Sequence, residues 1–372
     1  MRTERTYLDH NASVPMRAEA RAAVVRAIDA VGNPSSVHGE GRRARAVVEN
    51  AREQVARLVN AKPSEVVFTS GASEANNWVM AAGWATIAFA GFEHGSVLVP
   101  ARSSGADLVD LPVSPNGIAQ VERIAEALAC SARTLLTLMM ANNETGVIQP
   151  VAEAAALARE HGTMVHTDAV QAPGRVPVDF QALGVDAMSL SAHKLGGPRG
   201  VGALIIRDGV SLPALIKGGG QERRRRGGTE NVSGIAGFGA AAEAVANECD
   251  AAQRMATLRA RLEEGIVRAT PGAVIIGKDA ARLPNTSCVA CPGKSAETLV
   301  IKLDLEGIAV SAGAACSSGK VGSSHVLESM KLSTEIARSA IRVSLGPQTQ
   351  DKDIAAFLAA WKKVAGSAAL AA

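Results

Sequence analysis

Residues 164–207 read MVHTDAVQAPGRVPVDFQALGVDAMSLSAHKLGGPRGVGALIIR. Three short apolar runs of strand type stand in this stretch, MVHT (164–167), AMSL (187–190) and ALIIR (203–207), and polar residues follow the first two. Short buried strands that are separated by longer segments are typical of a sheet whose connections cross over it. This stretch therefore predicts the centre of an α/β fold.

The same alternation continues outward along the chain. Further strand-type runs are VVFT (66–69), SVLVP (96–100) and LLTLMM (135–140). Helical periodicity lies between and beyond them, near residues 17–31, 40–60, 118–130, 151–161, 232–268, 295–305 and 350–365. Strands that alternate with helices predict a mostly parallel sheet covered on both faces. After about residue 268 the elements become shorter and mixed, which indicates a second, smaller domain that the N-terminal segment joins.

Composition excludes several classes of protein. The chain has 372 residues, 39 Lys and Arg against 36 Asp and Glu, and a formal net charge of +3. This balance argues against a nucleic-acid or membrane-surface partner. The first residues, MRTERTYLDHN, contain no apolar stretch, and the longest apolar region (78–92) is shorter than a membrane-spanning helix of about 20 residues. Five scattered cysteines are typical of a reducing compartment, so a cytoplasmic location is predicted.

Polar clusters follow four of the predicted strands. VVFT leads into SGASEANN, LLTLMM into ANNETG, MVHT into Asp168, and AMSL into Ser191 and Lys194. Ligands of such sheets bind at the carboxyl ends of the strands. We therefore expect these clusters to converge on one pocket.

Lys194 and Asp168 suit pyridoxal phosphate chemistry. A lysine just past a buried strand is partly desolvated, which lowers its pKa and makes its amine a nucleophile for a Schiff base. A carboxylate such as Asp168 can keep the pyridine ring of that cofactor protonated. Residues 70–73 (SGAS) lie between a strand and a helix and suit a phosphate. Neither a P-loop nor a GxGxxG dinucleotide motif is present at the expected position. The plain alternatives are a surface lysine and a helix-capping aspartate.

The remaining candidates are weaker. Cys316 lies in SAGAACSSGK, a run of small residues that suits an exposed, reactive thiol. Cys288 and Cys291 form a CxxC without a second ligand pair, so we interpret them as packing residues and predict no metal site. Residues 223–226 (RRRR) lack the interleaved aromatics of a nucleic-acid platform. Arg342 is a candidate clamp for a substrate carboxylate, with a surface ion pair as its alternative.

A series of motifs runs almost from end to end of the chain: YLDHNASVP, GNPSSVHGEG, FTSGASEANN, FEHGSVLVPA, ANNETGVIQP, HTDAVQAPGRVPVD, SLSAHKLGGPRGVGAL, GGGQERRRRGGTENV, LPNTS, SAGAACSSGK, SSHVL and IRVSLG. In this order they resemble the NifS/IscS-type cysteine desulfurases of the class V aminotransferase-like group. The resemblance implies the fold of fold type I pyridoxal-phosphate transferases, with a seven-stranded-type, mostly parallel sheet in a large domain (16–255). It also implies a smaller α+β domain (1–15 and 256–372) that carries the catalytic cysteine loop.

The resemblance also implies a role for each matching residue. Lys194 would bind pyridoxal 5′-phosphate as a Schiff base, His94 would stack on its ring and help move protons, and Cys316 would be the nucleophile that takes sulfur from L-cysteine as a persulfide, leaving L-alanine. The other implied cofactor contacts are Asp168, Gln171, Ala72, Ser73, Ser191, His193 and, from the neighbouring subunit of a homodimer, Thr229. Asn143 and Arg342 would bind the substrate carboxylate. A sulfur-acceptor protein such as an iron–sulfur scaffold is the implied partner.

Three other functions stay open at this stage. Selenocysteine lyase would use the same residues, whereas an aminotransferase would not need Cys316. A non-catalytic dimeric scaffold would be expected to lose Lys194, Asp168 or His94, and all three are present.

Overall fold

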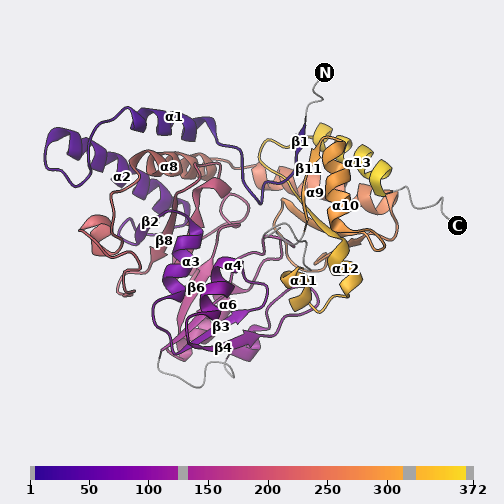
Figure 1. Ribbon diagram of the computed structural model, residues 1–372, viewed down its shortest axis with the longest axis horizontal. Helices are drawn as coiled ribbons and strands as arrows, with labels where there is room; N and C mark the ends of the chain where they lie inside the picture. The colour runs from indigo at the N-terminus through magenta and orange to yellow at the C-terminus, as the bar shows by residue number, and fades with distance from the viewer. Residues whose placement is uncertain (1–4, 125–132, 313–323, 366–372) are drawn as a thin grey trace.

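A seven-stranded sheet lies at the centre of the larger part of the chain (Figure 1). The computed structural model describes residues 5–124, 133–312 and 324–365. The strands follow the order β2 (Val66–Thr69), β8 (Gly202–Ile206), β7 (Ala187–Ser191), β6 (Met164–Asp168), β5 (Thr134–Thr137), β3 (Thr86–Ala90) and β4 (Asp107–Leu111). β8 is antiparallel to both of its neighbours and the other pairs are parallel. The prediction of a mostly parallel sheet is confirmed.

Helices cover both faces of this sheet. Alternate strand residues face opposite layers: Val67 belongs to the apolar cluster of α3 (Ala72–Met80) and α4 (Gly95–Arg102), whereas Val66 belongs to the cluster of the other layer. That other layer contains α2 (Gly39–Leu58), α6 (Val151–Glu160), α7 (Phe180–Leu183) and α8 (Val232–Ala246). α1 (Ala18–Ile28) packs on α8, and Figure 1 shows α1, α2 and α8 together. A single-turn helix, η1, spans Val121–Arg123.

One predicted strand is wrong. Residues 96–100 (SVLVP) lie inside helix α4. The buried residues of this helix are Val97, Leu98 and Ala101, a spacing that fits a helix face, while Val99 is 66% exposed. A strand would have placed Val97 and Val99 on the same face. The alternating valines fit a strand as well as a short helix, and His94, whose Nδ1 accepts from the Ser96 N–H, caps the helix that forms.

A second core lies beside the first. Its four-stranded sheet has the order β12 (Ser311–Ala312), β13 (Ala340–Ser344), β10 (Thr286–Ala290) and β9 (Val274–Ile275). β1 (Thr6–Tyr7) pairs in parallel with β11 (Ile308–Ala309), so the N-terminal segment lies against this part of the chain. Its helices are α9 (Ala251–Ala269), α10 (Ala296–Leu305) and α13 (Asp351–Ala365). The buried apolar side chains of α11 (His325–Ser329) and α12 (Thr334–Ser339) belong to the first core. The domain boundaries given above stay a prediction.

Two details of this region bear on the sequence analysis. The periodicity over 232–268 belongs to two helices, because α8 ends at Ala246 and α9 begins at Ala251. Cys288 and Cys291 are both buried among apolar side chains, which supports their interpretation as packing residues. Burial also raises the pKa of the Cys288 thiol far above its ordinary value.

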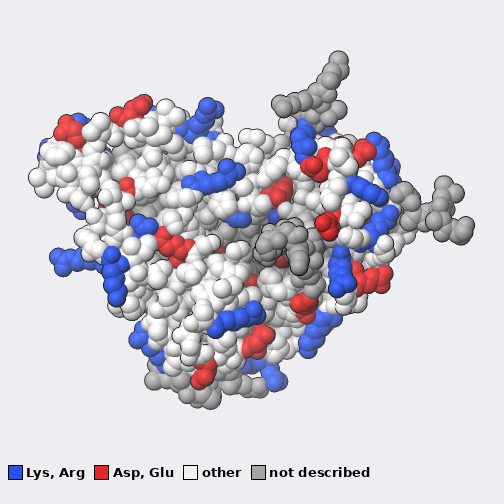
Figure 2. Space-filling model, viewed as in Figure 1, with Lys and Arg blue, Asp and Glu red and all other residues white. Residues whose placement is uncertain are grey.

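The surface carries both signs of charge. On the face shown in Figure 2, Lys and Arg side chains are interspersed with Asp and Glu side chains. Within the described ranges, no helix combines the length and the apolar character that crossing a membrane requires.

Candidate active site

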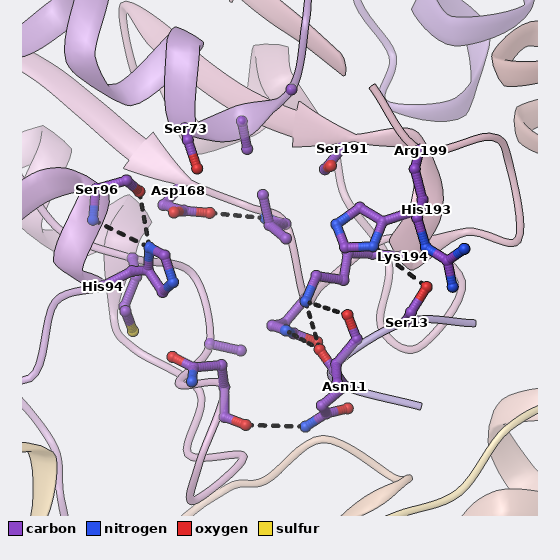
Figure 3. A pocket seen from close by; sticks show the side chains of 18 of the residues that line it. Asn11, Ser13, Ser73, His94, Ser96, Asp168, Ser191, His193, Lys194 and Arg199 are labelled. Atoms are coloured by element: carbon purple, nitrogen blue, oxygen red, sulfur yellow. Dashed lines mark hydrogen bonds between the residues drawn. The ribbon is translucent and has the colours of Figure 1, made fainter. Parts of the chain in front are cut away.

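A cavity of about 710 Å³ opens where strands β2, β5, β6 and β7 end (Figure 3). All four polar clusters that follow these strands contribute to its lining. Ten of the predicted site residues line it: Ala72, Ser73, His94, Asn143, Asp168, Gln171, Ser191, His193, Lys194 and Arg342. Ser311 and Ala312 of β12 complete the wall from the second core. Thr229 is exposed and lies outside this lining, and Cys316 lies outside the described residues.

Lys194 sits at the end of the short helix η2 (Ala192–Lys194), directly after β7. Its Nζ donates to the backbone oxygens of Asn11 and Ala12, the latter at 3.0 Å. Burial lowers the pKa of Lys194 to about 7, with Arg342 and Arg175 acting in the same direction. At neutral pH a large share of this amine is therefore uncharged and nucleophilic.

Asp168 ends β6 and points into the same cavity (Figure 3). Its Oδ1 accepts from the Val170 N–H at 3.0 Å and its Oδ2 accepts from Asn76 Nδ2 at 2.7 Å. These donors fix the carboxylate while it remains on the cavity wall. A carboxylate held in this way can pair with a protonated ring nitrogen of a bound ligand.

His94 faces Asp168 across the cavity. Its Nδ1 accepts from the Ser96 N–H at 3.1 Å and lies 2.7 Å from Ser96 Oγ. The ring is accessible from the cavity, yet the surrounding protein excludes enough water to lower its pKa. Asp168 opposes this shift, whereas Lys194 and His325 add to it. His94 is therefore neutral near pH 7.

The turn between β2 and α3 suits an anion. Gly71 has a φ of 156°, which L-residues rarely adopt, and no side chain in the described part of the chain caps α3. The first N–H groups of the helix therefore face the cavity without an intrahelical partner. β8 can pass beside this turn because residue 202 is glycine, since a Cβ there would lie 2.7 Å from Gly71 Cα. Ser73 and Ser191 add hydroxyls on either side of the turn (Figure 3).

Arg342 extends from β13 into the cavity wall. Its Nη1 donates to the Asn143 backbone oxygen at 3.0 Å and its Nη2 pairs with Asp9 Oδ1 at 2.8 Å. Its Nε is buried without a hydrogen-bond partner among the described residues. A guanidinium that lines a cavity suits a ligand carboxylate.

Gln171 and His193 are held by neighbours. The Gln171 side chain donates to the Asn11 backbone oxygen at 3.1 Å and accepts from Arg175. His193 Nδ1 lies 3.4 Å from Ser13 Oγ, and burial together with nearby Lys194 lowers its pKa to about 4. His193 thus adds a neutral ring to the wall.

Ion pairs and hydrogen bonds hold the loop with four arginines against the large sheet and α3. Glu222 is buried, and its carboxylate accepts from both terminal nitrogens of Arg52, at 2.8 and 2.9 Å, and from the Phe68 N–H at 2.9 Å. Residues 222–224 follow one another with φ between 47° and 66°, an uncommon conformation for residues other than glycine. Arg226 pairs with Glu74 of α3 at 2.9 Å, which leaves less free positive charge for a nucleic acid.

Several further functional candidates are not among the residues that the sequence predicts. Asn76, Ser96 and Arg175 contact predicted site residues, and Arg199 and Asn11 line the cavity. The position of Arg199 five residues after Lys194, in the glycine-rich turn, was a usable signal. The other four are visible only once the chain is folded. Within the described ranges, no cluster of three or more His, Cys, Asp or Glu side chains is arranged to hold a metal ion.

Comparison with known proteins gives a consistent result. The profile of the "Aminotransferase class-V" family matches residues 6–357. A cysteine desulfurase of Cereibacter sphaeroides is 42% identical over 363 residues, which cover 94% of this chain and 93% of that protein. Cysteine desulfurase IscS of Dictyoglomus turgidum is 38% identical, with 94% and 91% covered. The X-ray structure of a NifS-like protein from Rickettsia africae superimposes with a TM-score of 0.91 at 34% identity, and covers 97% of this chain and 99% of that one.

Proposed function

This chain belongs to the class-V aminotransferase family, and from that membership we propose that it is a cysteine desulfurase that uses pyridoxal 5′-phosphate. The observation that carries the proposal is Lys194, an amine with a pKa of about 7 in a cavity that also presents Asp168 and a helix N-terminus. The substrate would be L-cysteine. The products would be L-alanine and a persulfide on Cys316.

The cavity fits the cofactor. Lys194 would bind its aldehyde carbon, Asp168 would pair with the ring nitrogen, and His94 would stack on the ring. The phosphate would lie at the turn before α3, held by Ala72, Ser73, Ser191 and His193, with Thr229 supplied by a second subunit of a homodimer. Gln171 would contact the ring hydroxyl. When bound, pyridoxal phosphate supplies an acceptor for the electron pair that is left at the substrate α-carbon after its proton departs.

The protein side chains would bind and orient the substrate. Arg342 lines the cavity, and with the Asn143 side chain it would hold the cysteine carboxylate. Lys194, released from the cofactor by the substrate amine, would move the α-proton, because its pKa near 7 suits both uptake and release. The backbone oxygens of Asn11 and Ala12 would hold its ammonium form.

The atoms and electrons of the sulfur transfer balance without an added oxidant. The Cys316 thiolate attacks the substrate sulfur, the Cβ–S bond breaks, and the carbon that is released gains a proton as alanine forms. Cys316 follows Ala312, a residue of the cavity wall, by four positions, so at most about 14 Å of chain separates them. A thiol or a sulfur-acceptor protein, such as an iron–sulfur scaffold, would then take the sulfur from the persulfide.

The test is product analysis on the purified protein with L-cysteine and a thiol reductant. Wild type is expected to be yellow and to form alanine and sulfide in equal amounts. Cys316→Ala should stop sulfide release, while Cys249→Ala, which removes an exposed free cysteine, should not. Pyruvate and ammonia in place of alanine would contradict desulfuration, and a colourless protein without either product would contradict the cofactor.

A further inference from the structure

A chain of hydrogen bonds connects buried Asp168 to His94 at the cavity. Asn76, in α3, is fully buried, and its Nδ2 donates one hydrogen to Asp168 Oδ2 at 2.7 Å and the other to Ser96 Oγ at 2.8 Å. Ser96 Oγ in turn lies 2.7 Å from His94 Nδ1. The chain therefore runs from the carboxylate through an amide and a hydroxyl to the imidazole.

The direction of each bond follows from what the groups can donate. An ionised carboxylate only accepts, so the nitrogen of the Asn76 amide, and not its oxygen, must face Asp168. That same nitrogen then donates to Ser96 Oγ, whose own hydrogen is left to point at His94 Nδ1. The Ser96 backbone N–H, which can only donate, also points at Nδ1, at 3.1 Å. Two donors converge on Nδ1, so this nitrogen carries no hydrogen.

Asn76 holds this position at a cost in stability. Its Oδ1 is buried and has no hydrogen-bond partner among the described residues. A buried polar atom without a partner destabilises a fold. Packing alone does not explain such an amide, whereas the placement of its two N–H donors does.

We propose that Ser96, held by the buried amide of Asn76, is a positioning residue that fixes His94 as the neutral tautomer with its hydrogen on Nε2. The ring edge away from Ser96 is turned toward the cavity, so His94 presents an N–H donor there and not a base (Figure 3). Proton uptake at this face then belongs to Lys194. This inference rests on the proposed function for its effect on catalysis, but the tautomer itself does not depend on it.

The test is nuclear magnetic resonance of the full-length, cofactor-loaded protein labelled with ¹⁵N in its histidines, of which there are seven. The shifts of the two ring nitrogens and their couplings to the ring protons distinguish the tautomers, and a His94→Asn variant assigns the signals. Wild type is expected to show His94 only as the Nε2–H form near pH 7. Ser96→Ala removes the hydroxyl donor at 2.7 Å and leaves only the longer backbone bond at 3.1 Å on Nδ1, so a fraction of the Nδ1–H tautomer should appear. We expect kcat to fall about tenfold, the effect of one lost hydrogen bond. Ser96→Thr, which keeps the hydroxyl, should restore both.

The matched control is Ser103→Ala. Ser103 follows the same helix, is exposed and donates to the Val99 backbone oxygen at 3.0 Å, so its loss perturbs α4 without touching the chain of bonds. It should leave tautomer and kcat unchanged. A wild-type signal from the Nδ1–H form would overturn the proposal, and so would a Ser96→Ala protein with an unaltered tautomer. A protein that shows the Nε2–H tautomer but releases no sulfide would support this proposal while contradicting the proposed function.

Discussion

The rate at which Lys194 captures pyridoxal phosphate is expected to reach half of its maximum near pH 7. Burial, Arg342 and Arg175 lower the pKa of this lysine from 10.5 to about 7. About half of the amine is then neutral at pH 7, compared with about one part in 3,000 for an ordinary lysine. The protein thus gains roughly a thousandfold in nucleophilic amine at neutral pH.

The assay is stopped-flow absorbance. The protein is stripped of cofactor, mixed with pyridoxal phosphate at a series of pH values, and the rate of Schiff-base formation is fitted to a titration curve. Arg175→Gln removes a cation that disfavours the ammonium form, so its midpoint should move to higher pH. Arg159→Gln, an exposed arginine outside the cavity, should leave the midpoint unchanged. A wild-type midpoint near the ordinary lysine value, or an Arg175→Gln midpoint that does not rise, would refute the reasoning.

Three further outcomes follow from the other buried charges. Glu222→Gln should lower the free energy of unfolding by about 3–5 kcal/mol in urea denaturation, because Arg52 keeps a buried charge without its main partner. Burial raises the pKa of Glu144 from 4.5 to about 7, so the folded protein binds this proton more tightly than the unfolded protein. The free energy of unfolding should therefore fall by about 3 kcal/mol as the pH rises from 4.5 to 7. Glu144→Gln should remove this pH dependence in thermal melts across that range. Arg342→Lys should raise KM for L-cysteine about 10- to 100-fold in steady-state kinetics, with a smaller effect on kcat.

The sequence predicted β2, β5, β6, β7 and β8 because buried strands have a simple signature, but it did not predict β3 or β4. MVHT, AMSL and VVFT are short and followed by polar residues, and all of their side chains except that of Met164 are buried. SVLVP has the same composition but belongs to α4, because His94 caps a helix there and Val99 is left at the surface. Composition over five residues could not distinguish these two outcomes.

Some of the site residues could be predicted from the sequence and others could not. Lys194 and Asp168 were accessible to sequence reasoning because their chemistry and their place after a strand point the same way. Asn76 and Ser96 were not, because each acts through a contact that joins segments far apart in the chain: Asp168 lies 92 residues from Asn76, and Ser96 lies 20 residues from it. A residue whose role is to orient another carries no signal of its own in a single sequence.

The contacts of Asn11, in the N-terminal segment, make the active site depend on both cores. Asn11 is buried, and its Nδ2 donates to the Asn143 backbone oxygen and to Thr286 Oγ1, while its Oδ1 accepts from Asn285. Its own backbone oxygen accepts from Lys194. The acceptor that holds the Lys194 amine is thus fixed by residues of β10 and of the turn before it, which belong to the second core. Any shift of the second core relative to the sheet would move that oxygen, and with it the amine, so the position of Lys194 depends on the packing of the two cores against each other.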